Sequence, residues 1–196
     1  MKYYQEITLI PHAELALNFI WSKLYAQLHL ALVELQDAQG RVPVGVSLPK
    51  YQLKAGKHVS PLGDKLRVFA CDEATLQQLN LSQWLNRLLD YVHVTGIRPV
   101  PASVKAYATY QRRQFNGSPE NMARRRLKRK GDISFEQAVA LYEPHVVHSN
   151  LPYIRLKSLS NEQAFNLFIE KKAVDEASGF KFGTYGLSST ASVPDF

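Results

Sequence analysis

Apolar residues along the first hundred positions recur at two spacings, one typical of helices and one of strands. Ile20, Leu24 and Leu28 lie four residues apart, which predicts a long amphipathic helix. Aromatic and β-branched runs between Gly and Pro residues predict strands. The expected order is strand, helix, strand, strand, helix, strand, the ferredoxin-like (RRM-like) arrangement. The predicted ranges are 3–10, 13–35, 44–48, 66–71, 72–89 (capped by Asp72, with a break near Asn80) and 91–98.

An arginine-rich helix is predicted in the second half of the chain. Ser118 suits its N-cap, Pro119 its first turn and Glu120 the positive end of its dipole. Gly131 is expected to end it. At 100° per residue its cations surround most of the helix, so the helix should not bury one face in a core. The basic positions are Arg124, Arg125, Arg126, Lys128, Arg129 and Lys130.

The remaining elements complete an α+β fold. Residues 101–117 are expected to be extended, and Ser134 with Gln137 forms a capping box for a second helix over residues 135–142. Three strands follow, at residues 153–157, 165–171 and 180–187. We therefore predict a ferredoxin-like domain at residues 1–100 and a C-terminal α/β region at residues 101–196 that bears the arginine-rich helix.

Charge is concentrated in one part of the sequence. The chain has a net charge of +7 and a pI of about 9.5. Residues 105–130 hold nine Lys or Arg against one acid, a net charge of +8. A solvated charged face is the ordinary explanation of a charge run, but no acids are interleaved here. An anionic membrane surface would require a wide apolar face on the same helix. The pattern therefore favours contact with nucleic acid.

Other features limit the class of protein. The single cysteine, Cys71, allows no disulfide framework within the chain and suits a cytoplasmic location. No apolar run is long enough for a membrane span, so no membrane partner is expected. His145 and His148 lie three residues apart but have no third ligand nearby in the sequence. Neither a metal nor another cofactor is expected.

His29 is a candidate general base. It lies on one helical stripe with Trp21 and Tyr25. A lone helical histidine is most often structural. RNA chemistry changes this balance, because a 2′-hydroxyl beside a phosphodiester is a built-in nucleophile that requires only a well-placed base active near neutral pH. Just before the basic helix, Arg112 and Gln114 are residue types that read guanine and adenine, although both are also ordinary loop residues.

Taken together, the motifs resemble the repeat-processing endoribonuclease of CRISPR type I-F systems, the f subtype of the Cas-six family, also called Csy-four. The resemblance runs over essentially the whole chain. It rests on the order and spacing of several short segments. These are residues 23–32, 45–49, 111–114, 118–120, 124–127, 156–158, 165–169 and 183–188.

The resemblance implies a role for three catalytic residues. His29 matches the histidine that deprotonates the 2′-hydroxyl, Ser158 the serine that holds that ribose, and Tyr185 the tyrosine that orients the imidazole. The implied products carry a 2′,3′-cyclic phosphate and a 5′-hydroxyl, and no metal takes part. Without the resemblance, Ser158 would be interpreted as a surface serine and Tyr185 as a core residue.

The same resemblance implies RNA-binding residues and partners. Phe165 matches the aromatic that stacks under the closing base pair, although by itself it would be interpreted as core. Arg112 and Gln114 match the pair that reads purines at the foot of the stem. The basic helix would contact the stem, with Arg126, Arg129 and Lys130 as groove and phosphate contacts. The implied partners are a CRISPR repeat stem-loop and the other subunits of the type I-F crRNA-guided complex. The alternative is an RNA-binding module without chemistry, such as an RNA chaperone or a ribosome-associated protein; a DNA-binding regulator is a more distant third.

Overall fold

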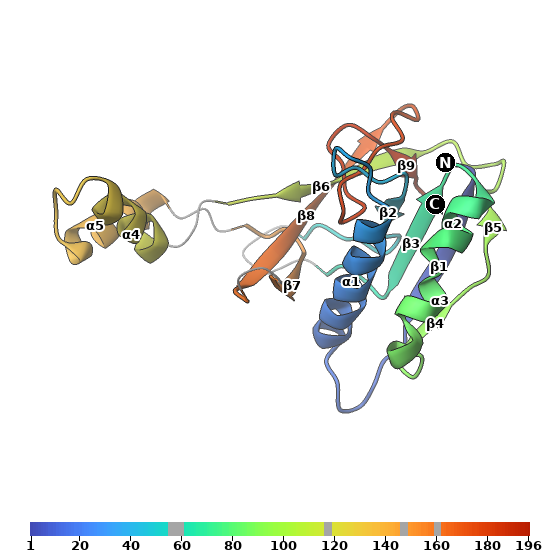
Figure 1. Ribbon diagram of the computed structural model, residues 1–196, viewed down its shortest axis with the longest axis horizontal. Helices are drawn as coiled ribbons and strands as arrows, with labels where there is room; N and C mark the ends of the chain where they lie inside the picture. The colour runs from blue at the N-terminus through green and yellow to red at the C-terminus, as the bar shows by residue number, and fades with distance from the viewer. Residues whose placement is uncertain (55–60, 116–118, 146–148, 159–161) are drawn as a thin grey trace.

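The computed structural model describes residues 1–54, 61–115, 119–145, 149–158 and 162–196. Its N-terminal sheet has the strand order β2-β3-β1-β4. The strands are β1 (Tyr3–Leu9), β2 (Gly45–Ser47), β3 (Lys65–Ala70) and β4 (Val92–Val94). β1 is antiparallel to both β3 and β4, and β2 is antiparallel to β3. Helices α1 (Leu17–Glu34), α2 (Glu73–Leu79) and α3 (Leu81–Trp84) lie on one face of the sheet (Figure 1). This order and helix placement confirm the predicted ferredoxin-like fold.

The two helical stretches of this domain can be compared with their predicted bounds. The first begins at Leu17 rather than at residue 13, because Ala16 has an extended backbone and the first fully buried side chain is Ile20. The second breaks where predicted: Asn80 adopts a left-handed conformation with φ 46° and ends α2. Asp72 caps α2 through a 2.8 Å hydrogen bond from the Thr75 amide, as expected.

The strand predicted over residues 91–98 is divided into β4 and β5 (Arg98–Pro99), both of which pair with β1. Ile7 lies opposite Val94, whereas Tyr4 lies opposite Arg98. Between these two pairs, two residues of β1 therefore lie opposite three on the other side, and the extra residue makes a bulge. Its position is marked by the amide of Thr95, which donates to the Glu6 carbonyl at 2.9 Å.

A second antiparallel sheet has the order β7-β8-β6-β9, formed by β7 (Tyr153–Lys157), β8 (Ala164–Val174), β6 (Tyr107–Arg113) and β9 (Val193–Pro194). The predicted strands at 153–157 and 165–171 are confirmed. The strand predicted over residues 180–187 is wrong. Phe182 makes a single bridge to Val42, after which the chain turns, with Gly186 at φ +68°. A left-handed residue inside this stretch is incompatible with a continuous strand.

Buried side chains of both sheets belong to one hydrophobic cluster. Helix α1 packs against β7, and the Tyr110 hydroxyl of β6 donates to the Leu48 carbonyl beside β2. The two predicted domains, residues 1–100 and 101–196, therefore share this core, and the division at residue 100 stays a prediction. No helix in the described part of the chain is long and apolar enough to cross a bilayer.

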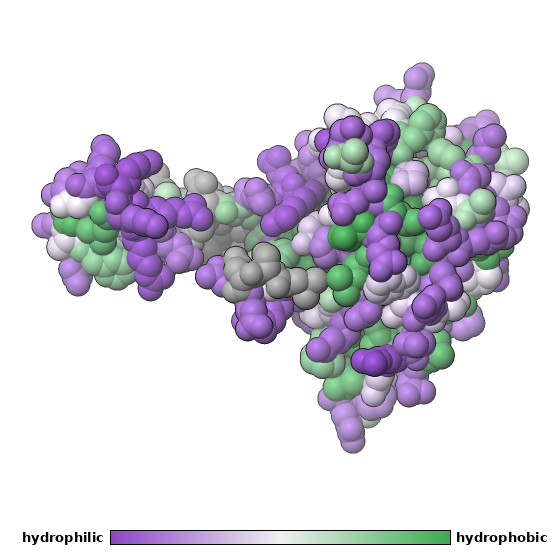
Figure 2. Space-filling view, in the orientation of Figure 1, coloured by the Kyte–Doolittle hydropathy of each residue, from purple (hydrophilic) through white to green (hydrophobic). Residues whose placement is uncertain are grey.

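Helices α4 (Pro119–Arg129) and α5 (Phe135–Tyr142), followed by the short η2 (Glu143–His145), form a small lobe that projects from the sheets (Figure 1). On the face seen in Figure 2, hydrophilic residues surround a small hydrophobic patch on this lobe. The two helices pack on each other through Ala123 and Ala138, which are fully buried. The predicted capping box of Ser134 and Gln137 is present. The proposed N-cap Ser118 and the candidate ligand His148 lie outside the described residues.

Candidate active site

His29 is held at the edge of the core by the backbone of a distant turn. It is half-buried on α1, next to the fully buried Leu28. Its Nδ1 lies 2.9 Å from the carbonyl oxygen of Thr184. Because a carbonyl can only accept, Nδ1 must carry the hydrogen in this contact. In the neutral ring, Nε2 is then left with an unprotonated lone pair and is the atom that can take a proton.

The Tyr185 ring lies flat against the His29 imidazole. Their centroids are 4.1 Å apart and the ring planes differ by 9°. The Tyr25 hydroxyl donates to the Tyr185 carbonyl at 2.9 Å. Tyr25 and His29 lie four residues apart on the same face of α1. This face therefore binds two consecutive backbone carbonyls, those of Thr184 and Tyr185. Burial raises the pKa of Tyr25, which keeps its hydroxyl neutral as a donor.

The turn over residues 183–186 is fixed by backbone hydrogen bonds as well. The Gly186 amide donates to the Gly183 carbonyl at 2.8 Å, and the Val46 amide of β2 donates to the Gly186 carbonyl at 3.0 Å. Burial raises the pKa of the Tyr185 hydroxyl, although the nearby Arg112 charge opposes this shift. The His29 imidazole, the Tyr185 ring and the turn over residues 183–186 are therefore held together as one unit by these contacts.

Arg112 links this unit to Phe165. Its guanidinium carbon lies 5.7 Å from the Tyr185 ring centroid and 5.4 Å from the Phe165 ring centroid. Arg112 is exposed near the end of β6, whereas Phe165 is half-buried near the start of β8. Four residues that are far apart in the sequence, including His29, thus make a continuous row of contacts.

Ser158 lies at the same end of the sheet. It follows β7 directly, is half-buried, and its amide donates to the Gln163 carbonyl at 2.8 Å, which opens the hairpin loop between β7 and β8. Phe165 lies opposite Leu156 in this hairpin. β7, the strand that Ser158 follows, packs against α1, the helix that carries His29.

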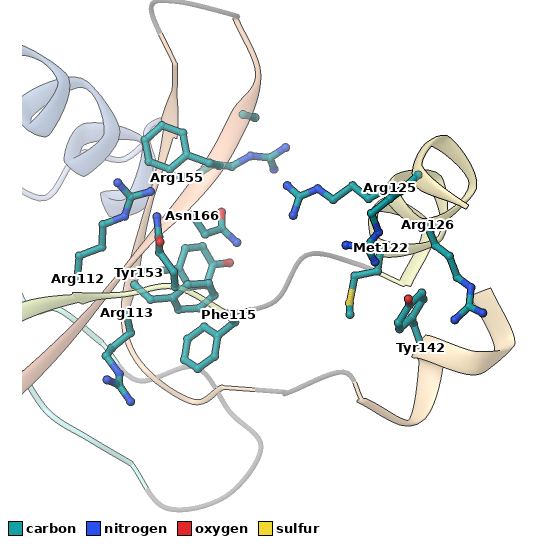
Figure 3. Close-up of a pocket in the computed structure, with 15 residues that line it drawn as sticks. Arg112, Arg113, Phe115, Met122, Arg125, Arg126, Tyr142, Tyr153, Arg155 and Asn166 are labelled. Atoms are coloured by element: carbon teal, nitrogen blue, oxygen red, sulfur yellow. The ribbon is translucent and has the colours of Figure 1, made fainter. Parts of the chain in front are cut away.

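A groove of about 1200 Å³ separates the tip of the second sheet from α4 (Figure 3). Its lining contains no acidic residue among the parts of the chain that are described. Gln114 and Phe165 line it together with Phe115, which follows β6, Tyr153 of β7 and Phe168 of β8. Six arginines line it: Arg112, Arg113, Arg125, Arg126, Arg129 and Arg155. Such a groove is complementary to a polyanion.

The cations of α4, and Lys130 just after it, differ in whether they line the groove. Arg125, Arg126 and Arg129 line the groove, whereas Arg124, Lys128 and Lys130 do not. Arg124 instead donates to the Asn121 side chain at 3.1 Å and lies over the Phe135 ring.

Arg126 has protein partners. It binds Asp132 through two hydrogen bonds of 3.1 and 2.7 Å. Hydrogen bonds to Asp132 and to Tyr142 raise the pKa of its guanidinium. An RNA that contacts Arg126 must therefore share this side chain with Asp132.

Several lining residues were not predicted from the sequence, namely Arg113, Arg155, Tyr153, Asn166 and Phe168. A signal for Arg155 exists, because it alternates with the buried Ile154 and Leu156 on β7 and so must face outward. The sequence does not show that this outward face looks toward α4. Within the described ranges, no three His, Cys, Asp or Glu side chains are placed to hold a metal ion.

Comparison with known proteins places these features in a family. A family model described as "CRISPR-associated protein (Cas_Csy4)" matches residues 4–196. A protein of Escherichia coli (strain UTI89 / UPEC) named "CRISPR-associated endonuclease Cas6/Csy4" is 33% identical over 198 residues, with all of both chains covered. A protein of the same name from Pseudomonas aeruginosa (strain UCBPP-PA14) is 34% identical over 200 residues, again with full coverage of both.

Solved structures offer weaker likenesses. One titled "An RAMP protein binding different RNA substrates" has a TM-score of 0.37 at 10% identity and covers 98% of this chain and 100% of its own. Another, "Characterization of a Cas6-related gene from Pyrococcus furiosus", has a TM-score of 0.36 at 12% identity, covering 98% and 99%. Neither likeness is close enough to bear on function. The family match and the two full-length relatives are decisive: the chain belongs to the Cas_Csy4 family of CRISPR-associated endonucleases.

Proposed function

We propose that this protein is a metal-independent endoribonuclease that binds the stem-loop of a CRISPR repeat RNA and cuts at the 3′ base of the stem to produce mature crRNA. One observation carries the proposal. An imidazole whose Nδ1 is engaged by the Thr184 carbonyl, and whose Nε2 is left as a base, is linked through the Tyr185 ring to Arg112, which lines an arginine-rich groove. The two relatives named as CRISPR-associated endonucleases support the assignment.

The chemistry follows from the free ring nitrogen. Nε2 of His29 takes the proton of the 2′-hydroxyl, and the resulting oxygen attacks the adjacent phosphorus. The bond from phosphorus to the 5′-oxygen of the next nucleotide breaks, and that oxygen receives a proton. The products are a 2′,3′-cyclic phosphate and a 5′-hydroxyl. Tyr185 keeps the imidazole plane fixed by stacking, and Ser158 holds the ribose that supplies the nucleophile. The reaction needs accurate positioning rather than a metal-bound hydroxide.

The groove supplies that positioning. Phe165 stacks under the closing base pair, and Arg112 and Gln114 read purines at the foot of the stem. The groove arginines of α4 contact the stem and its phosphates. The major groove of A-form RNA is normally too deep and narrow for side chains. A short hairpin is open at its ends, which gives a slim helix such as α4 a way in. After cleavage the stem stays bound, and the protein becomes a subunit of the type I-F crRNA complex.

The test compares cutting and binding of a repeat hairpin. The wild-type protein should cut the hairpin in EDTA, and His29→Ala should abolish cutting while the dissociation constant changes little. His93→Ala is the matched control, because His93 is exposed on β4, away from the groove. If His29→Ala cuts at the wild-type rate, the mechanism is wrong. If the wild-type protein binds but never cuts, the chain is an RNA-binding module instead.

A further inference from the structure

The sheet side of the groove presents an arginine to which the resemblance gave no role. Arg155 is exposed in the middle of β7, between the buried side chains of Ile154 and Leu156. Its strand is paired along its length with β8, where Asn166 lies directly opposite. The backbone that carries Arg155 is therefore held in place by the hairpin.

Arg155 also differs from its neighbours in its partners. Arg113 lies 3.5 Å from Glu170, Arg126 is bound to Asp132, and Lys157 lies 3.4 Å from Glu162. No acidic side chain in the described part of the chain forms an ion pair with Arg155 or with Arg125. Both line the groove, and Figure 3 shows Arg155 extending from the sheet toward α4 while Arg125 extends from α4 toward the sheet.

Two unneutralised guanidinium groups that project into one groove repel each other. An anion between them removes the repulsion and accepts hydrogen bonds from both. A phosphodiester suits this position, because the planar guanidinium fork matches the geometry of its two free oxygens. A rigid strand on one side and a helix on the other would hold such a group without rearrangement of the backbone.

We propose that Arg155 and Arg125 form a clamp, and that one backbone phosphate of the bound RNA lies between their guanidinium groups. This inference rests on the proposed function, since it assumes that the groove binds the repeat hairpin. The clamp lies close to the foot of the stem, because Arg155 pairs with Asn166, the residue after Phe165. Its contribution is to affinity and register rather than to base identity, since phosphate contacts carry no sequence information.

The test is a set of binding titrations with the repeat hairpin over a range of KCl concentrations. Arg155→Gln should weaken binding about tenfold. It should also reduce the slope of log K against log[KCl], but by less than the 0.7–0.9 that is roughly the share of one whole phosphate contact, because Arg125 still contacts that phosphate. Arg98→Gln is the matched control, because it removes the same charge from an exposed position on β5 outside the groove. This control should leave the slope unchanged.

Single methylphosphonate substitutions along the lower stem locate the contact. One of them should weaken binding to the wild-type protein about tenfold or more, and should weaken binding to Arg155→Gln and to Arg125→Gln by a clearly smaller factor. If every substitution weakens binding to Arg155→Gln by the same factor as to the wild type, the clamp does not exist. If Arg155→Gln behaves like Arg98→Gln while the wild type binds and cuts, this inference fails and the proposed function stands. If the wild type does not bind the hairpin, both are overturned.

Discussion

The turn that holds His29 depends on Gly186, and replacing this residue is expected to separate catalysis from RNA binding. Gly186 has φ +68°, and a Cβ at this position would lie 2.6 Å from Cγ1 of Val46. Gly186→Ala therefore adds a left-handed alanine and a steric clash with β2. The turn can relieve the clash only by moving away from β2, and Thr184 and Tyr185 would move with it.

The magnitude follows from these two terms. A left-handed conformation costs about 1–2 kcal/mol for a residue with a Cβ. Overpacking of a buried contact costs about 1–3 kcal/mol. The free energy of unfolding should thus fall by about 2–5 kcal/mol, which a domain of ordinary stability survives. A shift of about 1 Å in a catalytic group can cost roughly 100-fold in rate, so the cleavage step should slow by about that factor.

The assay combines urea denaturation with single-turnover cleavage at saturating protein. Binding of the hairpin should change much less than cleavage, because α4 and most of the groove lining lie apart from this turn, although Arg112 lies over the Tyr185 ring. Gly183→Ala is the control within the same turn, since its Cβ would meet nothing closer than 3.6 Å. Adding Val46→Ala to Gly186→Ala should restore part of the cleavage rate by removing the clashing atom. If Gly186→Ala matches Gly183→Ala in both stability and cleavage rate, the turn does not position His29.

Two further predictions concern the ring stack and Glu6, the half-buried carboxylate of an ion-pair group. Tyr185→Phe should cut nearly as fast as the wild type, because the stack on His29 is kept. Tyr185→Leu should slow single-turnover cleavage by about 3- to 10-fold, which corresponds to the energy of an aromatic pair. An equal loss of rate in both variants would show that the Tyr185 hydroxyl matters instead. Burial raises the pKa of Glu6, but hydrogen bonds and charge from Lys65 and Arg67 outweigh this effect and lower it. A lowered folded-state pKa means that the stabilisation is fully present above the unfolded pKa and is lost as the pH falls through the folded-state pKa. Glu6→Gln should therefore reduce the free energy of unfolding, measured by urea denaturation, by about 1–3 kcal/mol near pH 7 and by much less in acid. A loss of stability that is the same at both pH values would contradict the lowered pKa of Glu6.

Much of the fold follows from local sequence signals. The Asp72 cap, the break at Asn80 and the capping box of Ser134 and Gln137 are local features, and the structure has all three. The ferredoxin-like order also follows from the sequence of predicted elements. The strand expected over residues 180–187 fails for a tertiary reason, because Gly186 turns there against Val46, a contact that nothing within the segment reveals.

The candidate site was harder to predict, because its geometry joins distant segments. His29 was identifiable as a candidate, but its partner Thr184 is 155 positions away and contributes only a backbone carbonyl. No side-chain pattern marks a carbonyl. Tyr25 was visible on the same helical stripe as His29, yet its contact with the turn requires the folded chain. Arg155 was recognisable as an outward-facing strand residue, but only the structure shows which surface it faces.

The most direct test of the account uses the RNA rather than the protein. A repeat hairpin that carries a single 2′-deoxyribose at the nucleotide 5′ of the cut retains its shape and its phosphates but lacks the proposed nucleophile. The account predicts that the wild-type protein binds this hairpin with an unchanged dissociation constant and does not cut it in a single-turnover assay. Cleavage of the deoxy-substituted hairpin at the rate of the all-ribose RNA would contradict the claim that the substrate's own 2′-oxygen attacks the phosphate.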